Sequence, residues 1–524
     1  MHGKPPAEAL SRRGFLGALG AGAMTPGLCV MGSAHAQTVP NFTIREDRFG
    51  RIFPNLPTFA APTPELSAAM LEIGRPGGIM DARDPLERGP ILLITDPALS
   101  INNPDNQTHT AGTTFFGQFV DHDVTFDLNS RLGEPTRPED SPNSRSPALD
   151  LDTVYGGGPT RSPQLYGRRS QQEPRAGIKL LVENGGLFED LPRTANGTAI
   201  LGDPRNDEHI ILAGLHAAFL LFHNNAVDYV AERDRRLSND EIFREARRLT
   251  TWHYQWMIVH EFLPQVIGQS LVNDILARGR RFYRPSVGFM PVEFQGACYR
   301  FGHSMVRPSY RANLAGDNGG PFFGFIFDPS QENATDPNDM RGGVRTPRRF
   351  IGWQTFFNFA DGNMRNNKRI DTTLSTPLFQ LPRSAIAGEG GPISLPQRNL
   401  LRHITWSLPS GQSIARAMGA PVLSSGDLQD LRGLGLQLDR STPLFFYVLR
   451  EAQLTAGGLT LGPVGGRIVG ETLIGLLQLN RNSYLRANPR WRPTLLDRLG
   501  QQSNDFKMVD FLTFAGVAPA QRGQ

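Results

Sequence analysis

Residues 116–123 read Phe-Gly-Gln-Phe-Val-Asp-His-Asp, an imidazole between two carboxylates within a stretch that has the apolar spacing of a helix. On a helix, Gln118 and His122 lie four residues apart and share one face. Asp121 and Asp123 then point about 100° to either side of that face. Three kinds of polar group therefore diverge from one turn. Taken alone, the octapeptide is most simply interpreted as an exposed Asp-His-Asp surface turn.

Further polar groups occur in three places along the chain. Residues 202–208 read Gly-Asp-Pro-Arg-Asn-Asp-Glu and open a long segment with helical periodicity. Residues 300–305, Arg-Phe-Gly-His-Ser-Met, lie in an apolar segment, and residues 397–402, Gln-Arg-Asn-Leu-Leu-Arg, add amides and cations. Helical spacing is strongest from Glu208 to about Val272, and strand-like alternation is scarce. The pattern predicts a mainly α-helical fold with long core helices.

The composition is that of a folded chain with a substantial core. Hydrophobic residues make up 39% of the 524 residues and charged residues 20%, which excludes disorder and a multispanning membrane protein. The formal net charge is +4, which does not imply a nucleic-acid partner. The length would allow three domains, although one large domain is also compatible with it.

The first 36 residues have the order of an export signal. Residues 11–13, Ser-Arg-Arg, precede a weakly apolar stretch rich in glycine and alanine, and residues 34–36 read Ala-His-Ala. This order predicts a twin-arginine signal peptide, export by the Tat translocase, a mature chain from about Gln37 and a periplasmic or secreted location without membrane insertion. A retained transmembrane anchor is the alternative, which Pro26 and the many glycines disfavour.

Three segments are expected: the signal peptide at 1–36, an extended arm with little regular structure at 37–105, and a catalytic domain at 106–524. Of the two cysteines, Cys29 leaves with the signal and Cys298 remains. An intrachain disulfide, a CxxCH haem attachment and CxxC zinc sites are therefore excluded. We interpret Cys298 as a buried, inert thiol rather than a haem thiolate.

Four histidines occur in pairs spaced by seven residues: His216 with His223, and His253 with His260. We interpret all four as residues that pack between helices. The dipeptide at 260–261, His-Glu, lacks the second histidine of the HExxH motif, which excludes a zinc protease of that type.

In this order and spacing, the polar stretches resemble the animal haem peroxidases of the peroxidase–cyclooxygenase superfamily, and more closely their bacterial members. The resemblance runs from about Thr113 to Gly475 and includes residues 150–156 (Asp-Leu-Asp-Thr-Val-Tyr-Gly), 261–264 (Glu-Phe-Leu-Pro) and 461–467 (Leu-Gly-Pro-Val-Gly-Gly-Arg). It implies a single large helical domain with very little β-structure, in which haem lies between a distal and a proximal helix.

The resemblance also implies a role for each polar residue. His122 corresponds to the distal base, which takes a proton from hydrogen peroxide and returns it to the leaving oxygen. Arg205 corresponds to the arginine that stabilises the charge developing as the O–O bond breaks. Gln118 corresponds to the distal glutamine above the iron. His303 corresponds to the proximal iron ligand, and Asn399 to the amide that accepts its second ring N–H.

Two carboxylates and two arginines match positions that hold haem in this family. Asp121 and Glu208 correspond to the residues that form ester bonds with haem methyl groups, which implies covalently bound haem b. His209 stands where a mammalian member has the methionine of a sulfonium link, so that link is not expected. Arg300 and Arg402 match positions that pair with haem propionates. Ordinary helix-end carboxylates and surface salt bridges are the alternatives.

A calcium site is also implied beside the distal helix. A hard cation takes oxygen ligands. The expected ligands are the carboxylates of Asp123, Asp150 and Asp152, the Ser146 hydroxyl and the Ala148 carbonyl. A solvated acidic loop is the alternative.

The function implied is that of a peroxidase that reduces hydrogen peroxide through a ferryl-porphyrin radical and oxidises small donors, such as a halide, thiocyanate or a phenol. One alternative is a haem-dependent fatty-acid dioxygenase or cyclooxygenase. Those enzymes use a tyrosine three residues before the proximal histidine, where this chain has Arg300, with Tyr299 one place away. The other is a matrix or adhesion protein built on the same scaffold, although the full distal and proximal sets are present and an Arg-Gly-Asp motif is absent.

Overall fold

The structure is a computed structural model that describes residues 48–183, 188–343, 345–386, 390–501 and 504–522. The contacts within the chain separate residues 1–35 from residues 36–524, and all described residues belong to the second unit. The predicted signal peptide at 1–36, with Cys29, and the predicted start of the mature chain at Gln37 lie outside the described residues.

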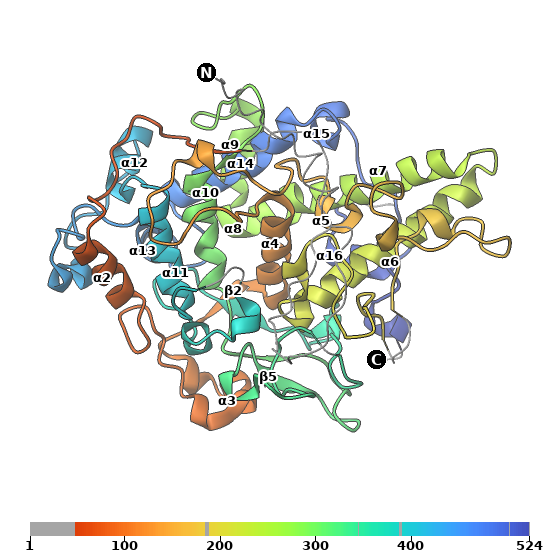
Figure 1. Ribbon diagram of the computed structural model, residues 1–524, viewed down its shortest axis with the longest axis horizontal. Coiled ribbons are helices and arrows are strands. Elements are labelled where there is room, and N and C mark those ends of the chain that lie inside the picture. Colours follow the sequence, from red (N-terminus) through yellow and green to blue (C-terminus); the bar gives the residue numbers. More distant parts are fainter. Residues whose placement is uncertain (1–47, 184–187, 344, 387–389, 502–503, 523–524) are drawn as a thin grey trace, which may run out of the picture. The chain divides into compact units, whose positions relative to one another are not determined.

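Helices are the main regular structure of the described residues (Figure 1). The α-helices are α2 (Pro64–Ile73), α3 (Gly89–Thr95), α4 (Ala111–Val124), α5 (Asp152–Tyr155), α6 (Ile210–Arg233), α7 (Asn239–Met257), α8 (Leu263–Ile267), α9 (Gln269–Arg278), α10 (Val292–Gly296), α11 (Leu395–Thr405), α12 (Gly411–Met418), α13 (Leu444–Ala456), α14 (Pro463–Leu479), α15 (Tyr484–Ala487) and α16 (Met508–Phe514). The prediction of a mainly α-helical fold is confirmed.

Short helical turns connect these helices. A π-helical turn, η7 (Ile258–Phe262), joins α7 to α8. The 3-10 turns are η1 (Leu86–Arg88), η2 (Pro97–Ser100), η3 (Pro138–Asp140), η4 (Pro163–Leu165), η5 (Ala176–Ile178), η6 (Pro204–Asp207), η8 (Cys298–His303), η9 (Pro329–Gln331), η10 (Trp353–Thr355), η11 (Thr376–Phe379), η12 (Arg383–Ala385), η13 (Gln429–Leu434) and η14 (Pro519–Arg522).

The β-structure of the described residues consists of three two-stranded pairs. β1 (Phe49–Gly50) pairs in parallel with β3 (Met290–Pro291). Two pairs are antiparallel: β2 (Asp105–Thr110) with β6 (Asn366–Lys368), and β4 (Ser309–Arg311) with β5 (Phe323–Phe325). The expectation of very little sheet is confirmed.

The segment before residue 106 differs from the predicted extended arm with little regular structure, because it contains two α-helices. In α2, the Thr63 side chain caps the first turn by accepting a hydrogen bond from the Leu66 N–H at 3.2 Å, and a proline occupies the first helical position. Leu66, Met70 and Ile73 are buried where the helix packs against α11. The helical spacing was obscured by the many surrounding prolines and glycines.

Helix α6 forms part of the core. It is the one described helix long and apolar enough to cross a membrane, but 83% of its most apolar window is buried inside the fold. It packs against α7, whose start is stabilised by a capping box between Ser238 and Glu241.

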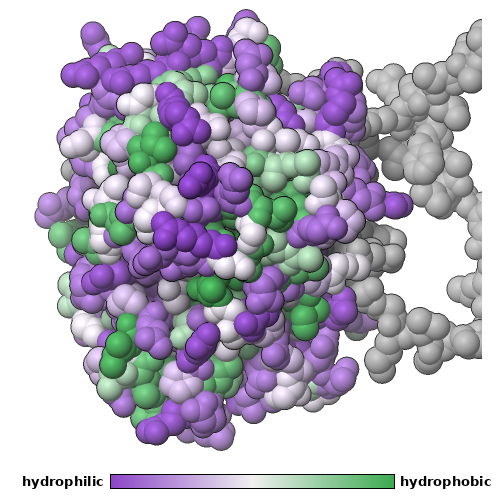
Figure 2. All heavy atoms as spheres, turned by 90° about the vertical axis from the view of Figure 1, so that its left-hand side faces the viewer, coloured by the Kyte–Doolittle hydropathy of each residue, from purple (hydrophilic) through white to green (hydrophobic). Residues whose placement is uncertain are grey.

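The molecular surface over α2 and α12 is largely hydrophilic, with apolar side chains in separate patches (Figure 2).

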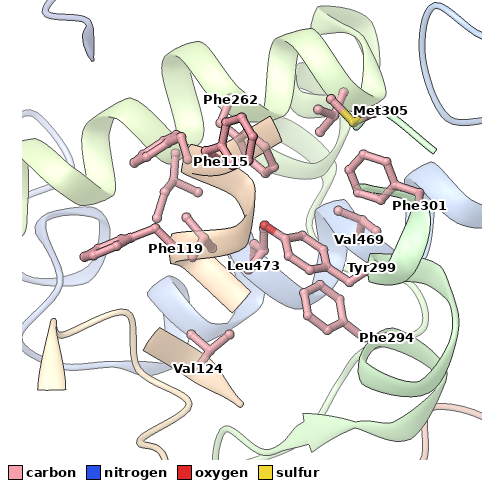
Figure 3. Packing of buried hydrophobic residues seen from close by; sticks show 14 of the residues in the cluster. Phe115, Phe119, Val124, Phe262, Phe294, Tyr299, Phe301, Met305, Val469 and Leu473 are labelled. Atoms are coloured by element: carbon pink, nitrogen blue, oxygen red, sulfur yellow. The ribbon is translucent and has the colours of Figure 1, made fainter. Parts of the chain in front are cut away.

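The π turn η7 directs an aromatic ring toward the centre of the fold. Such turns are frequent at functional sites. Phe262 ends this turn, and its ring approaches α4 so closely that a Cβ at Gly117 would stand 2.9 Å from ring atom Cε2 (Figure 3). Glycine at position 117 therefore allows the two helical segments to meet.

The first described residues are tied to the core by one buried carboxylate. Glu293 accepts hydrogen bonds from the backbone N–H groups of Ile52 and Phe53, each at 3.0 Å. We expect Glu293→Ala to lower the free energy of unfolding by about 2 kcal/mol, because it leaves buried donors without an acceptor. Glu293→Gln, which keeps one acceptor, should cost less. Urea denaturation measures both, and equal stability of wild type and the alanine variant would contradict the tether.

Candidate active site

A cavity of about 240 Å³ brings together residues from distant parts of the sequence. All the residues predicted for the catalytic and haem-binding sets line it: Gln118, Asp121, His122, Arg205, Glu208, Arg300, His303, Asn399 and Arg402. They come from α4, the 3-10 turn η6, the residue after that turn, the 3-10 turn η8 and α11. Positions nearly 300 residues apart in the chain thus face one space.

His122 is placed as a proton acceptor. Its ring atom Nδ1 lies 2.8 Å from the Asn206 side-chain oxygen. Because an amide oxygen can only accept, Nδ1 carries the ring proton and Nε2 keeps a free lone pair. Burial, reinforced by the charge of Arg205, holds the pKa of His122 well below its usual value. The imidazole is therefore neutral near pH 7.

Arg205 is held rigidly by a buried carboxylate. Its Nε and Nη2 donate to the two oxygens of Asp203 at 3.0 and 2.7 Å, and Nη2 also donates to the His122 carbonyl at 3.1 Å. Arg145 approaches Asp203 from another direction, with Nε 2.8 Å from a carboxylate oxygen. Burial alone would raise the pKa of Asp203, but the two arginines hold it well below its ordinary value. The guanidinium of Arg205 is thus fixed beside the cavity.

The Gln118 amide has one orientation. His209 accepts the Leu212 N–H at its Nδ1, so its Nε2 carries the proton and donates to the Gln118 oxygen at 2.9 Å. The Gln118 nitrogen donates to a Glu208 oxygen at 3.3 Å. His209, where the sulfonium link was not expected, thus caps α6 and orients the glutamine.

Burial raises the pKa of two carboxyl groups of the cavity wall. Burial raises the pKa of Asp121, against the opposing charges of Arg300 and Arg205. Burial likewise raises the pKa of Glu208, to about 8. A carboxyl group that is neutral can lie beside an apolar ring without the free-energy cost of burying a charge there.

His303 lies at the end of a 3-10 turn rather than in one continuous proximal helix. Helix α10 ends at Gly296, and η8 starts after Ala297, whose φ of −141° and ψ of −71° break the helix. The side-chain nitrogen of Asn399, from α11, lies 2.7 Å from His303 Nδ1, so in this orientation the amide donates to the ring. Rotation of the amide by 180° about its last side-chain bond would place its oxygen there to accept the Nδ1 proton, which leaves Nε2 able to ligate a metal. Burial and the Arg300 charge lower the pKa of His303 to about 3.

The two arginines predicted to meet propionates have different surroundings. Arg300 donates from Nε to the Gln295 carbonyl at 2.7 Å. Arg402 donates from Nη1 to Asp127 and to the Ser130 hydroxyl, both at 2.6 Å. Arg402 is thus already paired with a carboxylate of the chain, which the sequence did not suggest.

Three aspartates converge behind the distal helix. Oxygens of Asp123, Asp150 and Asp152 lie within 4.8 Å of one another. Burial and the charges of Asp152 and Asp150 raise the pKa of Asp123 well above its ordinary value. Arg145 Nη1 lies 3.6 Å from an Asp152 oxygen, and Arg247 donates to the Asp150 carbonyl at 3.4 Å. The convergence of the three carboxylates favours a further cation.

The two other predicted calcium ligands lie in the same loop and contact protein groups. The Ser146 N–H donates to an Asp152 oxygen at 2.9 Å. The Ala148 carbonyl accepts a hydrogen bond from the Asn480 amide at 2.9 Å. A carbonyl oxygen has a second lone pair, so that contact does not prevent Ala148 from binding a cation.

The residues before His303 are packed tightly against the distal helix. The Tyr299 hydroxyl donates to the Gly117 carbonyl at 3.1 Å, and its ring stacks on Phe294 with centroids 4.4 Å apart (Figure 3). Cys298 is fully buried, and burial raises the pKa of its thiol well above the usual value. Cys298 is therefore a buried, protonated thiol, as predicted.

Sequence reasoning missed several residues that support the site. Asp203 and Asn206 adjoin the predicted arginine, and this adjacency was the available signal. The sequence contains no such signal for the contacts of Asp127 with Arg402 and of His209 with Gln118, because these partners are distant in sequence. His216, interpreted as a residue that packs between helices, also lies with its Nδ1 2.9 Å from the Asn206 amide nitrogen.

Comparisons with known proteins find similarity to peroxidases over part of the chain. A sequence model described as animal haem peroxidase matches residues 127–320. Chorion peroxidase from Aedes aegypti is 25% identical over 367 residues, which are 65% of this chain and 41% of that protein. The chain spans less than half the length of each of the first curated relatives that it matches.

Solved structures share the fold. Peroxidase A from Dictyostelium discoideum superposes with a TM-score of 0.58 over 90% of this chain and 97% of that one, at 16% identity. A fatty acid alpha-dioxygenase from Arabidopsis thaliana gives a TM-score of 0.53 over 91% of this chain and 75% of that one, at 14% identity. The sequence matches therefore cover part of the chain, and the similarity to the solved structures is one of fold.

Stability should depend on pH through Glu208. Its folded pKa of about 8 exceeds its ordinary value of 4.5, so the folded protein keeps a proton that the unfolded chain has released. The resulting stabilisation is complete below pH 4.5 and is lost as the pH rises through 8. We expect haem-free Glu208→Gln protein to lose less stability than wild type between about pH 5 and pH 8.

The control for this measurement is Glu232→Gln, at the exposed end of α6. Chemical denaturation at several pH values should give this variant the wild-type slope of unfolding free energy against pH. A wild-type slope in Glu208→Gln as well would show that Glu208 does not carry the dependence.

Proposed function

We propose that this chain is a haem peroxidase that reduces hydrogen peroxide and oxidises a small donor. One observation carries the proposal: a neutral histidine and a fixed arginine, His122 and Arg205, share a cavity with the amide-supported imidazole of His303. The first pair supplies a base and a permanent positive charge, and His303 supplies a metal ligand.

The cavity residues fit haem. His303 would hold the iron, and Arg300 and Arg402 would meet the propionates, with Arg402 sharing its charge with Asp127. Gly302 has open space where a Cβ would stand, which leaves room beside the proximal ligand. Haem, when bound, supplies the iron and the conjugated ring that accept oxidising equivalents from peroxide.

Side chains of this protein then transfer the proton and stabilise the developing charge. His122 Nε2 accepts the proton of the bound peroxide and returns it to the departing oxygen, which leaves as water. Arg205 stabilises the negative charge on that oxygen, and its pairing with Asp203 means that the guanidinium needs no reorientation. Gln118 is oriented beside them and is proposed to position water or a donor.

Covalent attachment of haem b is part of the proposal. Asp121 and Glu208 line the same cavity, and burial raises the pKa of both. Ester bonds to haem methyl groups would remove both titrating groups. The position of both carboxyl groups in the cavity wall supports this assignment.

Calcium is proposed at the cluster of Asp123, Asp150 and Asp152, with Ser146 and Ala148 as further ligands. The three converging carboxylates fit a hard cation with oxygen ligands. Because Asp123 follows His122 directly, bound calcium would join the distal helix to the loop before α5.

The donor is proposed to be small: a halide, thiocyanate or a phenol. The fold is shared with a fatty acid alpha-dioxygenase, which keeps that activity as the alternative. Peroxidase chemistry is favoured because Arg300 stands three residues before His303, and the Tyr299 hydroxyl is engaged by the Gly117 carbonyl. A matrix or adhesion role is less favoured, since the distal and proximal groups are all present.

Export to the periplasm or the exterior by the Tat translocase is also proposed. Its support is the twin-arginine order of residues 11–13 and the Ala-His-Ala sequence at 34–36. Cys298 is the one cysteine after residue 36, so the exported chain would contain no intrachain disulfide.

Substitution of the distal arginine tests the peroxidase chemistry. Arg205→Ala should bind haem but react with peroxide more slowly by about 100-fold or more, because the developing charge loses its stabiliser. The rate for Arg205→Lys should lie between those of wild type and Arg205→Ala, since lysine keeps the charge and loses the bidentate geometry. Stopped-flow absorbance of the Soret band measures the rates.

A control for the arginine variants is Arg467→Lys, whose side chain is 15% exposed against 11% for Arg205 and which pairs with Asp274 away from the cavity. It should react at the wild-type rate. An unchanged rate in Arg205→Ala would remove Arg205 from the proposed mechanism.

Covalent attachment has a direct test. Haem-loaded protein treated with peroxide should retain its haem through acid–butanone extraction, and the intact mass should increase accordingly. Asp121→Asn should keep the link through Glu208, and the double variant Asp121→Asn with Glu208→Gln should release all haem. Complete extraction from peroxide-treated wild type would end the ester assignment while leaving haem binding in place.

A further inference from the structure

Asn206 connects the distal histidine to the core of the fold. It is fully buried, and its side chain meets three partners. Its oxygen lies 2.8 Å from His122 Nδ1, and its nitrogen lies 2.9 Å from His216 Nδ1 and 2.8 Å from the Thr153 hydroxyl. His122, His216 and Thr153 are also buried, so bulk water does not compete for these contacts.

The orientation of this amide decides which nitrogen of His122 carries the proton. An amide oxygen accepts and an amide nitrogen donates. In the observed orientation, the Asn206 oxygen requires a proton on Nδ1 of His122, which leaves Nε2 free. The opposite orientation would direct an N–H at Nδ1 and move the proton to Nε2, which could then no longer accept one.

In the observed orientation, the amide nitrogen of Asn206 faces His216 and Thr153. The His216 Nδ1 accepts from the Asn206 nitrogen, and the Thr153 hydroxyl oxygen accepts the other N–H of the same group. Both N–H groups of the amide are therefore occupied on the side away from His122. Only the carbonyl oxygen remains to face the distal imidazole.

We infer that Asn206 is a positioning residue that fixes His122 in the tautomer with a free Nε2, and that His216 fixes Asn206. This inference rests on the proposed peroxidase function for its consequence, since a free Nε2 is what a proton acceptor needs. The tautomer itself can be measured without turnover.

Two substitutions of Asn206 test the inference. Asn206→Leu has a similar shape and removes the acceptor, so the Nε2–H tautomer of His122 becomes populated. The rate of reaction with peroxide should fall about 10-fold or more, because part of the population lacks its base. Asn206→Asp keeps an oxygen facing Nδ1 and should restore most of that rate.

A vibrational readout separates positioning from general damage. In the ferrous carbon monoxide complex, an Nε2–H group donates to the ligand oxygen and lowers the C–O stretching frequency, whereas a free Nε2 does not. Infrared spectra should show a lower frequency in Asn206→Leu than in wild type and in Asn206→Asp. A merely structural role would not produce this pattern.

Two matched variants on helix α6 test whether His216 fixes Asn206. His216→Phe removes the acceptor that orients Asn206, and it should lower the C–O frequency and the peroxide rate. His223→Phe, two turns later on α6, removes a histidine that contacts the Tyr155 hydroxyl and the Ile178 carbonyl. It should change stability alone.

Several outcomes would overturn the inference. They are a wild-type spectrum with the lower frequency of an Nε2–H donor, an Asn206→Leu variant with the wild-type frequency and rate, or equal effects of His216→Phe and His223→Phe. If Asn206→Leu does not fold, Asn206→Asp and His216→Phe carry the same comparison. Wild-type protein that binds haem and ignores peroxide would refute the proposed function, while the infrared comparison would still decide the role of Asn206.

Discussion

The buried carboxylate of Asp203 holds together parts of the site that must keep fixed positions. The Arg205 guanidinium binds it with two hydrogen bonds, and Arg145 binds it from the loop that leads to Asp152 at the start of α5. Removing one partner of such a buried pair leaves an uncompensated charge and typically costs about 3–5 kcal/mol. The position of the distal arginine and that of the aspartate cluster therefore depend on the same group.

A single short turn presents most of the distal chemistry. Within the turn between Gly202 and Glu208, the Asp203 carboxylate holds Arg205, which lines the cavity. Asn206 contacts His122, and Glu208 forms part of the cavity wall. The turn is pressed closely on two sides: a Cβ at Gly202 would stand 2.4 Å from the Thr153 carbonyl oxygen, and a Cβ at Gly342 would overlap the Asp207 carbonyl oxygen. Its rigidity thus comes from backbone contact as well as from charge.

Much of this arrangement could be predicted from the sequence, because local spacing and family resemblance both identify residues that face one cavity. The helix at α4 and the cavity position of His303 follow from such patterns. The regular structure at α2 was missed because prolines and glycines surround a short amphipathic stretch. The pairing of Arg402 with Asp127 and the bond between His216 and Asn206 could not be predicted, because each joins helices or loops whose approach depends on packing of the whole core.

The π turn η7 has a consequence for how the chain can vary in length. A π turn accommodates one residue more than an α-helix would over the same rise, and each residue of an α-helix rotates the chain by about 100°. A deletion of one residue between Ile258 and Phe262 would therefore restore regular helix and leave the following side chains of α8 in their present orientation. The effect of the extra residue is thus confined to the turn itself, which holds the Phe262 ring against Gly117.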